Sequence, residues 1–200
     1  MRQFETCLLC GSVIITLQGY EHHKLVKRTS CKFIFCKQIP GLEELKAHYE
    51  LYPRANAISE ITIKRYNELL DTFEKYRKTN NMIDVGCGDG YFLAEAFKRG
   101  WRVFGTEFTD EAISVCIKKN ISMTKGPIKA ESYSADFFDV LTSFEVIEDI
   151  NNPIEETLIY KTILRSGGAI YITTPNFNSI SRVILGPRWN VIEYPEHLCY

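Results

Sequence analysis

The spacing of apolar residues changes along the chain, and from Asn81 onward it predicts strands that alternate with helices. Short continuous apolar runs are typical of buried strands, whereas apolar residues three and four positions apart are typical of helices. The predicted strands cover residues 82–85, 102–106, 121–124, 138–144 and 169–174, with helices predicted around 92–97, 111–119 and 154–164. Because such alternation produces a parallel sheet covered on both faces, the pattern predicts an α/β fold with a doubly wound sheet.

The chain before Asn81 has a weaker pattern and divides at Pro40-Gly41, a dipeptide typical of a turn. Two short strand-like pieces, over 12–17 and 32–35, precede this turn in a segment too small to bury a core without a metal or a neighbour. Helical spacing follows over 42–52 and again after Ser59, a residue type that caps helices. The predicted parts are a small segment over 1–40, a helical lead-in over 41–80 and the doubly wound domain over 81–200.

Composition narrows the function classes. The 200 residues carry a formal net charge of -1, and 45% of them are hydrophobic, which is ordinary for one globular domain with a small appendage. A near-zero charge argues against a nucleic-acid partner, because phosphate contacts need a basic surface. The longest apolar run, over 7–17, has polar breaks and no cleavage site, so neither a membrane span nor a signal peptide is predicted. Seven cysteines, an odd number, without a secretion signal predict a cytoplasmic location with reduced thiols.

A glycine-rich turn over residues 84–90 joins the first predicted strand of the domain to its first helix. Glycines allow the backbone to approach a ligand closely, and the helix N-terminus offers free N–H groups to an anionic part of it. Glu107 ends the second strand, where a carboxylate can accept hydrogen bonds from both hydroxyls of a ribose. The third glycine, Gly90, comes one place earlier than in a dinucleotide fingerprint, and the bulky Tyr91 follows it. The turn therefore favours a nucleoside ligand over a dinucleotide, and a nicotinamide oxidoreductase remains the less favoured enzyme class.

Several motifs in the same order make the sequence resemble the class I S-adenosylmethionine-dependent methyltransferases, which have a Rossmann-like fold. The motifs are Asp84-Val-Gly-Cys-Gly-Asp-Gly90, Glu107, Phe138-Asp-Val-Leu-Thr-Ser-Phe-Glu-Val-Ile-Glu148, Leu164-Arg-Ser-Gly-Gly-Ala169 and Thr173-Thr-Pro-Asn176. The resemblance covers residues 82–176 and implies that Glu107 binds the ribose of the cofactor, with Phe108 near its adenine. It implies the following cofactor-binding residues: Asp84, Gly86, Cys87, Gly88, Gly90, Tyr91, Glu107, Phe108 and Phe144.

Three acidic residues, Glu145, Glu148 and Asp149, follow the fourth strand. The segment is similar to that of the ubiquinone-biosynthesis O-methyltransferases, whose Glu-x-x-Glu-His pattern is associated with a divalent cation near the substrate. Asp149 stands where that pattern has His, and three carboxylates would suit Mg²⁺ better than Zn²⁺. The favoured alternative is that these side chains bind no metal and cap the next helix or are solvated. Glu145 is kept as a candidate catalytic residue.

The N-terminal segment resembles the zinc ribbon that precedes many bacterial methyltransferases of this kind. Cys7 and Cys10 form a Cys-x-x-Cys knuckle, whereas Cys31 and Cys36 have the wrong spacing for a second one. The resemblance rests on Phe33-Ile-Phe35, Pro40, Glu43-Glu-Leu45 and Tyr49, and it aligns Arg28 with the missing cysteine. Cys7, Cys10 and Cys31 would then hold a structural zinc, with the fourth ligand from Cys36, His22 or His23. The alternative is a degenerate ribbon that packs without metal.

Methyl transfer from a sulfonium is an in-line displacement in which positioning supplies much of the acceleration. A hydroxyl or enolisable acceptor also needs a base, and His197 is the candidate, in a segment similar to the Pro-x-His-Leu of relatives. A structural hydrogen-bonding role for His197 is the alternative. The predicted function is methyl transfer to oxygen or carbon of a small metabolite, lipid quinone or sugar. A non-catalytic cofactor-binding protein is the alternative from another class.

The resembled fold has seven strands, of which the last two follow the fifth as a hairpin. The sequence ends at Tyr200, so we expect a sheet cut short after strand five, with that strand as an apolar edge. The oligomeric state and the acceptor are not encoded in any pattern of the sequence.

Overall fold

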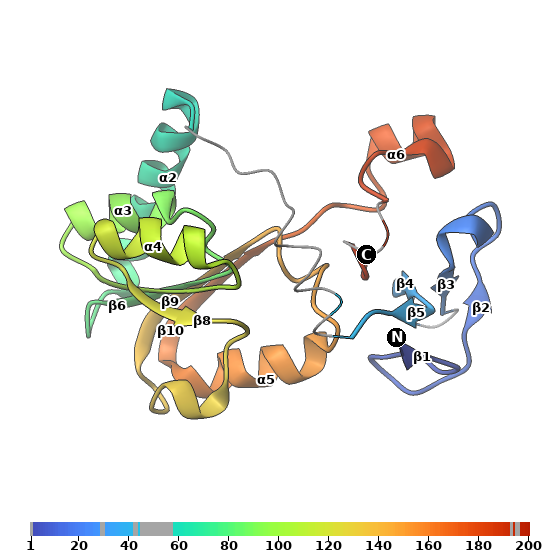
Figure 1. The fold of residues 1–200 in the computed structure, drawn as a ribbon, viewed down its shortest axis with the longest axis horizontal. Helices are drawn as coiled ribbons and strands as arrows, with labels where there is room; N and C mark the ends of the chain where they lie inside the picture. Colours follow the sequence, from blue (N-terminus) through green and yellow to red (C-terminus); the bar gives the residue numbers. More distant parts are fainter. Residues whose placement is uncertain (1, 29–30, 42–43, 45–57, 193, 195–196) are drawn as a thin grey trace. The chain divides into compact units, whose positions relative to one another are not determined.

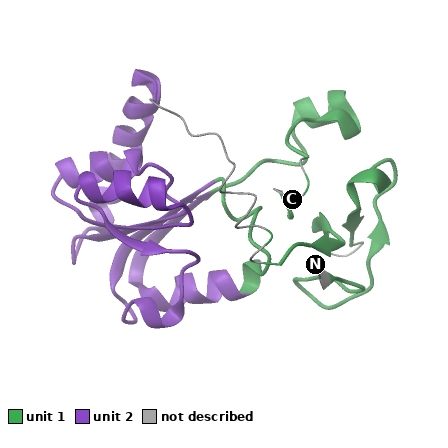
Figure 2. Ribbon diagram, viewed as in Figure 1, with its two compact units in different colours: residues 1–48, 145–154, 173–200 green, residues 49–144, 155–172 purple. Residues whose placement is uncertain are grey.

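The computed structural model describes residues 2–28, 31–41, 44, 58–192, 194 and 197–200. The chain forms two compact units, which Figure 2 shows in different colours. The first unit contains residues 1–48, 145–154 and 173–200, and the second contains residues 49–144 and 155–172. The predicted helix over 42–52 lies outside the described residues except for Glu44.

The second unit is built on a five-stranded sheet (Figure 1). Its strands are β6 (Asn81–Val85), β7 (Arg102–Glu107), β8 (Ser122–Lys125), β9 (Phe138–Phe144) and β10 (Leu164–Thr173). They lie in the order β10-β9-β6-β7-β8, and β6 pairs in parallel with both β7 and β9, as β7 does with β8. The first strand of this sheet, β6, therefore lies in the middle, and the later strands are added outward on both sides. This arrangement confirms the predicted doubly wound fold.

Helices cover both faces of this sheet. They are α2 (Glu60–Phe73), α3 (Tyr91–Lys98), α4 (Asp110–Lys118) and α5 (Pro153–Ile163). The expected cap of α2 is present, because the Ser59 hydroxyl accepts a hydrogen bond from the Thr62 N–H at 3.1 Å. Short 3-10 helices add η2 (Glu74–Tyr76) after α2 and η3 (Ala130–Ser132) before β9.

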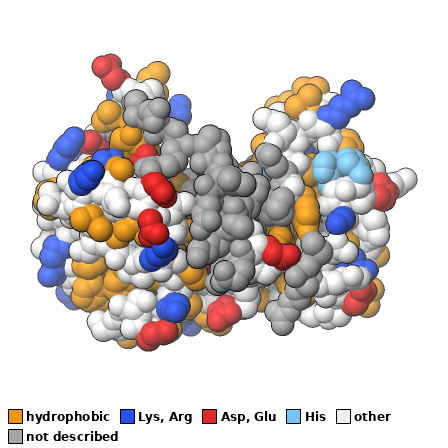
Figure 3. All heavy atoms as spheres, in the orientation of Figure 1, with side chains coloured by type: hydrophobic (Ala, Val, Ile, Leu, Met, Phe, Trp, Pro, Cys, Tyr) orange, Lys and Arg blue, Asp and Glu red, His pale blue; other side chains and the backbone are white. Residues whose placement is uncertain are grey.

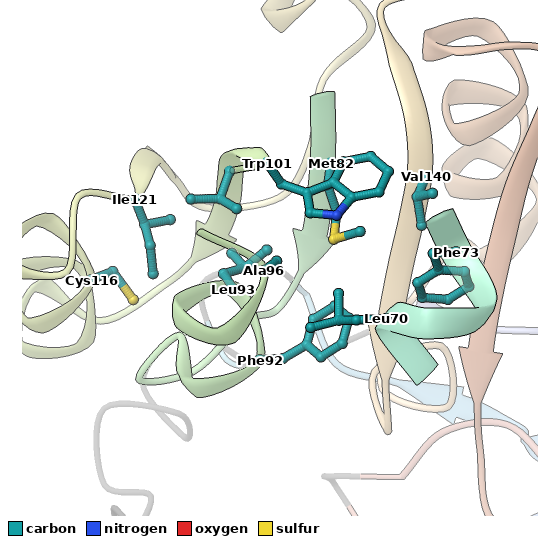
Figure 4. Packing of buried hydrophobic residues seen from close by; sticks show 11 residues of the cluster. Leu70, Phe73, Met82, Phe92, Leu93, Ala96, Trp101, Cys116, Ile121 and Val140 are labelled. Carbon is teal, nitrogen blue, oxygen red and sulfur yellow. The ribbon is translucent and has the colours of Figure 1, made fainter. Parts of the chain in front are cut away.

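Each face of the sheet has its own core, because neighbouring residues of a strand point to opposite faces. Met82 of β6 packs toward α2 and α3, while Ile83, the next residue, packs toward α5. Figure 4 shows the first of these cores, in which Leu70 and Phe92 face the sheet. Both clusters are almost fully buried, so the sheet is held rigidly between its helices.

Strand β10 differs from its prediction. The sequence suggests that Gly167-Gly168 ends a helix, but α5 already ends at Ile163 and both glycines lie inside β10. A Cβ atom on Gly168 would lie 2.8 Å from the carbonyl oxygen of Asp139 in β9. Glycine is therefore needed at this position for two backbones to approach, and not for a helix end.

The first unit contains the N-terminal ribbon, defined here as residues 2–41. Its strands are β1 (Arg2–Gln3), β2 (Ile15–Thr16), β3 (Leu25–Lys27), β4 (Ile34–Cys36) and β5 (Gln38–Ile39), with the 3-10 helix η1 (Glu21–His23) before β3. β1 pairs with β5, and β2, β3 and β4 form an antiparallel sheet. The sequence pattern missed β3, which is a run of only three residues.

The ribbon shares one core with the end of the chain. Tyr20, Leu25 and Ile34 of the ribbon are buried together with Phe177 and Trp189. The neighbour that the small ribbon needs is therefore supplied by residues more than 130 positions away in the sequence.

Helix α6 (Ile180–Leu185) is followed by the 3-10 helix η4 (Gly186–Arg188). Arg182, on the polar side of α6, makes two hydrogen bonds within this unit. Arg182 donates a hydrogen bond to the Phe177 carbonyl oxygen at 2.6 Å and another to the Tyr20 hydroxyl at 3.4 Å. Ile180 and Ile184 are more than three-quarters exposed, and Figure 3 shows hydrophobic side chains gathered over this helix. Among the described residues, no helix has the length and apolar character needed to cross a membrane.

Candidate functional site

The glycine turn between β6 and α3 has the backbone that only glycine adopts readily. Gly86, Gly88 and Gly90 have φ angles of +69°, +52° and +69°. A Cβ atom on Gly90 would also lie 2.5 Å from Ile121 Cδ1 and 2.8 Å from Cys116 Sγ. The turn is therefore shaped by three left-handed residues and leads directly into the N-terminus of α3, which begins at Tyr91.

The structure brings Glu107 to this turn. One carboxylate oxygen of Glu107 accepts a hydrogen bond from the Gly88 N–H at 3.0 Å, and the other accepts one from the Phe108 N–H at 2.7 Å. The Cys87 N–H donates to the Thr106 carbonyl oxygen at 3.0 Å, which ties the turn to β7. A carboxylate is thus held by backbone N–H groups beside a glycine-lined turn at the carboxyl end of the sheet, as the cofactor prediction requires.

Asp84 lies at the end of β6, where it is 3% exposed and accepts a hydrogen bond from the Thr142 hydroxyl at 2.7 Å. Burial, together with the charge of Glu107, raises the pKa of the Asp84 carboxyl group to about 7, although the Thr142 hydrogen bond opposes the change. Asp84, Gly86, Cys87, Gly88 and Glu107 therefore form one continuous group.

Phe144 and Tyr91, two aromatic residues of the predicted site, make ring contacts within the second unit. Phe144 ends β9, with its ring centroid 5.1 Å from that of Phe92 and 5.6 Å from that of Tyr171. The Lys119 ammonium lies 3.8 Å from the centroid of the Tyr91 ring, so Tyr91 packs toward α4.

Sequence analysis missed two residues beside the site. Cys116 of α4 donates a hydrogen bond from its thiol to the Gly88 carbonyl oxygen at 3.2 Å. The Gly126 N–H, just after β8, donates to the Glu107 carbonyl oxygen at 2.8 Å. The sequence pattern marks Cys116 only as part of the helix predicted around 111–119, and the turn after β8 could have been found from its place at the carboxyl edge of the sheet.

The acidic residues after β9 belong to the first unit. Glu145 has a φ angle of +53°, which is uncommon for a residue with a side chain, and its N–H donates to the Thr173 carbonyl oxygen at 3.2 Å. Glu148 is 1% exposed, and no described residue makes a hydrogen bond of ordinary geometry to either carboxylate oxygen. Burial raises the pKa of Glu148 and Glu145 raises it further, whereas His197 lowers it.

His197 is held by its ring and its backbone. Its Nδ1 atom lies 2.6 Å from the Val191 carbonyl oxygen, which can only accept a hydrogen bond. Nδ1 must therefore carry the hydrogen, and the neutral ring keeps its lone pair on Nε2. Nε2 lies 3.8 Å from a carboxylate oxygen of Asp149.

Three cysteines of the ribbon come together. The thiols of Cys7, Cys10 and Cys31 lie within 4.8 Å of one another, and they are the one such group of possible metal ligands that the described part of the chain contains. The sulfur of Cys31 is 3.8 Å from that of Cys7 and 3.7 Å from that of Cys10. A tetrahedral zinc with Zn–S distances of about 2.3 Å places sulfurs about 3.8 Å apart, so this cysteine cluster fits three vertices of a zinc site. Glu145, Glu148 and Asp149 do not form a comparable group.

The fourth vertex has no ligand among the predicted candidates. Cys36 is buried away from the cluster, with its thiol 3.6 Å from the His197 carbonyl oxygen, and burial raises its pKa to about 12. His23 contacts the Pro187 carbonyl oxygen at 2.9 Å through Nε2, and His22 stacks on His23. The Arg28 guanidinium instead contacts the Cys10 thiol. Although desolvation opposes it, hydrogen bonds from Cys7, the Ser12 backbone, Arg28 and Cys31 lower the pKa of Cys10 to about 7.

Comparisons with known proteins agree with this geometry. The family model described as "Methyltransferase domain" matches residues 58–200. The ubiquinone biosynthesis O-methyltransferase of Aeromonas salmonicida (strain A449) is 27% identical over 104 residues, which are 48% of this chain and 44% of that protein. The enzyme of the same name from Stutzerimonas stutzeri (strain A1501) is 28% identical over 104 residues, covering 48% and 45%. The chain thus spans about half the length of the curated relatives it matches.

Solved structures show the same fold. A SAM dependent methyltransferase from Archaeoglobus fulgidus matches with a TM-score of 0.53 and 21% identity, over 62% of this chain and 57% of that one. The structure titled "[4+2]-Cyclase SpnF" matches with a TM-score of 0.53 and 16% identity, over 68% and 61%. The family model covers well over half of the sequence, and the glycine turn with Glu107 lies within the matched range. The chain therefore belongs to the methyltransferase domain family.

Proposed function

We propose that this chain binds S-adenosylmethionine and transfers its methyl group to oxygen or carbon of a small molecule. The observation that carries the proposal is the Glu107 carboxylate, held by the Gly88 and Phe108 N–H groups beside a turn of left-handed glycines. A carboxylate at this place suits the two hydroxyls of a ribose, and the turn leaves room for the rest of the nucleoside. S-adenosylmethionine supplies an activated methyl group on a good leaving group.

The residues proposed to hold the cofactor are the continuous group around the turn and the aromatic residues beside it. Asp84, at the end of β6, would face the amino-acid part, and Phe108 would lie near the adenine. The other proposed contacts are Gly86, Cys87, Gly88, Gly90, Tyr91 and Phe144. Their part is to bind and orient the methyl donor, because positioning dominates an in-line displacement.

His197 is the proposed base for the acceptor. Its support is the tautomer, since Nδ1 donates to Val191 and leaves Nε2 able to take a proton. Asp149, 3.8 Å from Nε2, would stabilise the protonated ring. Glu145 is the second candidate, and its left-handed backbone is the kind of local strain often found at functional positions.

The acceptor class is the finer part of the proposal. Relatives named as ubiquinone biosynthesis O-methyltransferases support a small molecule, and an oxygen acceptor is favoured over carbon. A quinone precursor is the first class to test, and metabolite or sugar hydroxyls are the next.

A second candidate function follows from the fold itself. A protein titled as a cyclase shares this fold at a TM-score of 0.53, so the fold accommodates a reaction other than methyl transfer. A chain that binds the cofactor without transferring its methyl group is therefore the alternative.

We also propose a structural zinc at the cysteine cluster, with Cys7, Cys10 and Cys31 as ligands. The support is the sulfur spacing of 3.7 and 3.8 Å. The zinc would join the Cys-x-x-Cys turn to the turn between β3 and β4. We propose no divalent cation at Glu145, Glu148 and Asp149, because their carboxylate oxygens do not form a group of possible metal ligands. Seven free cysteines support a reducing compartment such as the cytoplasm.

Calorimetric titration with S-adenosylmethionine and with NADH tests the cofactor. We expect binding of the former alone, and we expect Glu107→Gln to weaken it at least tenfold because one charged ribose contact is lost. Glu111→Gln is the matched control, since Glu111 is an exposed glutamate on α4. Binding of NADH, or of neither compound, would contradict the proposal.

Transfer of a labelled methyl group to a panel of phenols, hydroxylated quinone precursors and sugars tests the reaction. We expect incorporation into a hydroxylated acceptor, and we expect His197→Ala to lower kcat with the cofactor affinity unchanged. Cofactor binding without any transfer would favour the non-catalytic alternative.

A further inference from the structure

We propose that the N-terminal ribbon is a positioning element for His197, because its strand β4 pairs with residues 198–200 through backbone hydrogen bonds. The inference rests on the proposed role of His197 as the base. It assigns the ribbon a part in the reaction itself, and it depends only on contacts within the first unit.

The pairing is short and antiparallel. The Cys36 N–H donates to the Leu198 carbonyl oxygen at 2.8 Å, and Ile34 and Tyr200 exchange two hydrogen bonds of 3.3 and 2.8 Å. Phe35 lies opposite Cys199 in the same pairing. Figure 1 shows the end of the chain beside β4.

Residues 198–200 pair with the side of β4 that faces away from β3. β4 pairs with β3 on one side, with Val26 opposite Phe35. Successive N–H groups of a strand point to opposite sides, so the N–H groups of Ile34 and Cys36 point away from β3. Residues 198–200 satisfy these groups, which makes the ribbon sheet complete only when this segment is in place.

The other side of the segment is also held. The N–H groups of Leu198 and Cys199 both donate to the Glu148 carbonyl oxygen, at 2.7 and 2.9 Å. His197 comes directly before this clamped segment, and its carbonyl oxygen accepts hydrogen bonds from the Cys36 thiol at 3.6 Å and the Tyr200 hydroxyl at 3.5 Å.

Two anchors then determine the direction of the His197 ring. The backbone is fixed by β4 and Glu148, and Nδ1 is fixed by the Val191 carbonyl oxygen at 2.6 Å. The shared core of Tyr20, Leu25, Phe177 and Trp189 lies among the same segments. A base must lie within hydrogen-bond reach of the proton it takes, so a displacement of about 1 Å at His197 lowers the rate.

Ile34→Pro tests the inference, with Ile34→Ala as the matched control. Proline removes the N–H that bonds Tyr200 and leaves the pairing with β3 intact, whereas alanine keeps the N–H and loses a comparable part of the buried side chain. We expect faster hydrogen exchange at the amides of residues 198–200 in the proline variant. We also expect kcat at least tenfold below that of the alanine variant, with S-adenosylmethionine affinity within twofold.

The same comparison in a His197→Ala background separates positioning from general destabilisation. If the ribbon acts through His197, the proline substitution lowers kcat by less than twofold once the imidazole is absent. An undiminished proline effect in that background would overturn the inference, as would equal amide exchange in the two Ile34 variants.

Tyr200→Pro provides a second route that leaves the ribbon sequence unchanged. It removes the N–H that donates to Ile34, and Tyr200→Ala controls for the lost ring. The same loss of kcat and the same dependence on His197 are expected. A chain that binds the cofactor but transfers no methyl group would defeat both proposals, whereas an active chain insensitive to these variants would defeat the positioning inference alone.

Discussion

Asp84 carries a carboxyl group at a place that water hardly reaches. Its side chain is 3% exposed, and burial raises its pKa from an ordinary 3.8 to about 7. Between pH 3.8 and about 7, the Asp84 carboxyl group is protonated in the folded chain and ionised in the unfolded chain. The free energy of unfolding therefore falls as pH rises through this window. Above the window, the loss of stability that ionised Asp84 causes no longer changes with pH.

Asp84→Asn removes this pH-dependent penalty. The amide oxygen can still accept the Thr142 hydrogen bond, and nothing at the position ionises. We expect the variant to gain stability at pH 8 relative to pH 5, by at most about 3 kcal/mol, because about two pKa units of the shift lie between these pH values. Urea unfolding at the two pH values measures the gain. An unchanged pH slope would contradict the assignment, and weaker cofactor binding by the variant would support the proposed contact.

Arg28 stands beside the cysteine cluster where a fourth thiolate would complete a zinc site. We expect Cys10→Ser to weaken zinc binding at least tenfold, because a thiolate ligand is lost, and Arg28→Cys to strengthen it. Cys36→Ser is the control, since Cys36 lies outside the cluster. Competition with a coloured chelator gives the affinities. Equal affinity of Cys10→Ser and the unaltered chain would exclude Cys10 as a ligand.

At the scale of elements, the site depends on how closely α3 and α4 approach the glycine turn. Gly90 is the point of closest approach, because Ile121 and Cys116 would both lie under 3 Å from an added Cβ atom. The positive φ angle and the lack of space act together at this one residue. The turn and both helices are therefore a single packed arrangement.

Gly90→Ala tests this packing against backbone strain alone. Gly19 is the matched control, because it also has a positive φ angle but nothing within 4 Å of an added Cβ atom. We expect Gly90→Ala to cost about 1–3 kcal/mol more than Gly19→Ala, through overpacking, and to weaken cofactor binding. Thermal unfolding and calorimetry measure the two effects. Similar costs for the two variants would show that strain alone determines the requirement for glycine.

At the scale of the molecule, each of the two compact units buries one of the two tryptophans. Trp101 is 2% exposed in the second unit, and Trp189 is 5% exposed in the first. The proposed zinc belongs to the first unit. A ligand stabilises the part of the structure that binds it, so loss of metal should act on one unit.

Single-tryptophan variants make this measurable. Trp101→Phe leaves fluorescence from the first unit, and Trp189→Phe leaves it from the second. We expect a chelator to lower the unfolding midpoint reported by Trp189 by several degrees and to leave that reported by Trp101 nearly unchanged. Equal shifts of both signals would mean that the units unfold together, and no shift would argue against the zinc.

The features of the fold that the sequence predicts are those determined by residues close together along the chain. The order of strands and helices after Asn81 follows from the apolar spacing, and the glycine turn with Glu107 follows from residue types that have few alternatives at such positions. The prediction that Gly167-Gly168 ends a helix was wrong, because the need for glycine comes from the Asp139 backbone of another strand. Such a contact leaves no pattern in the neighbouring sequence.

The sequence by itself determined the doubly wound sheet, the glycine turn with Glu107 and the family, since periodicity and short motifs encode these directly. Only the tertiary structure decided that Cys36 lies apart from the three cysteines that meet, and that residues 198–200 pair with β4. The physical reason is distance along the chain. Backbone hydrogen bonds between residues more than 160 positions apart need no particular side chains, so the packing of the whole unit determines where they form.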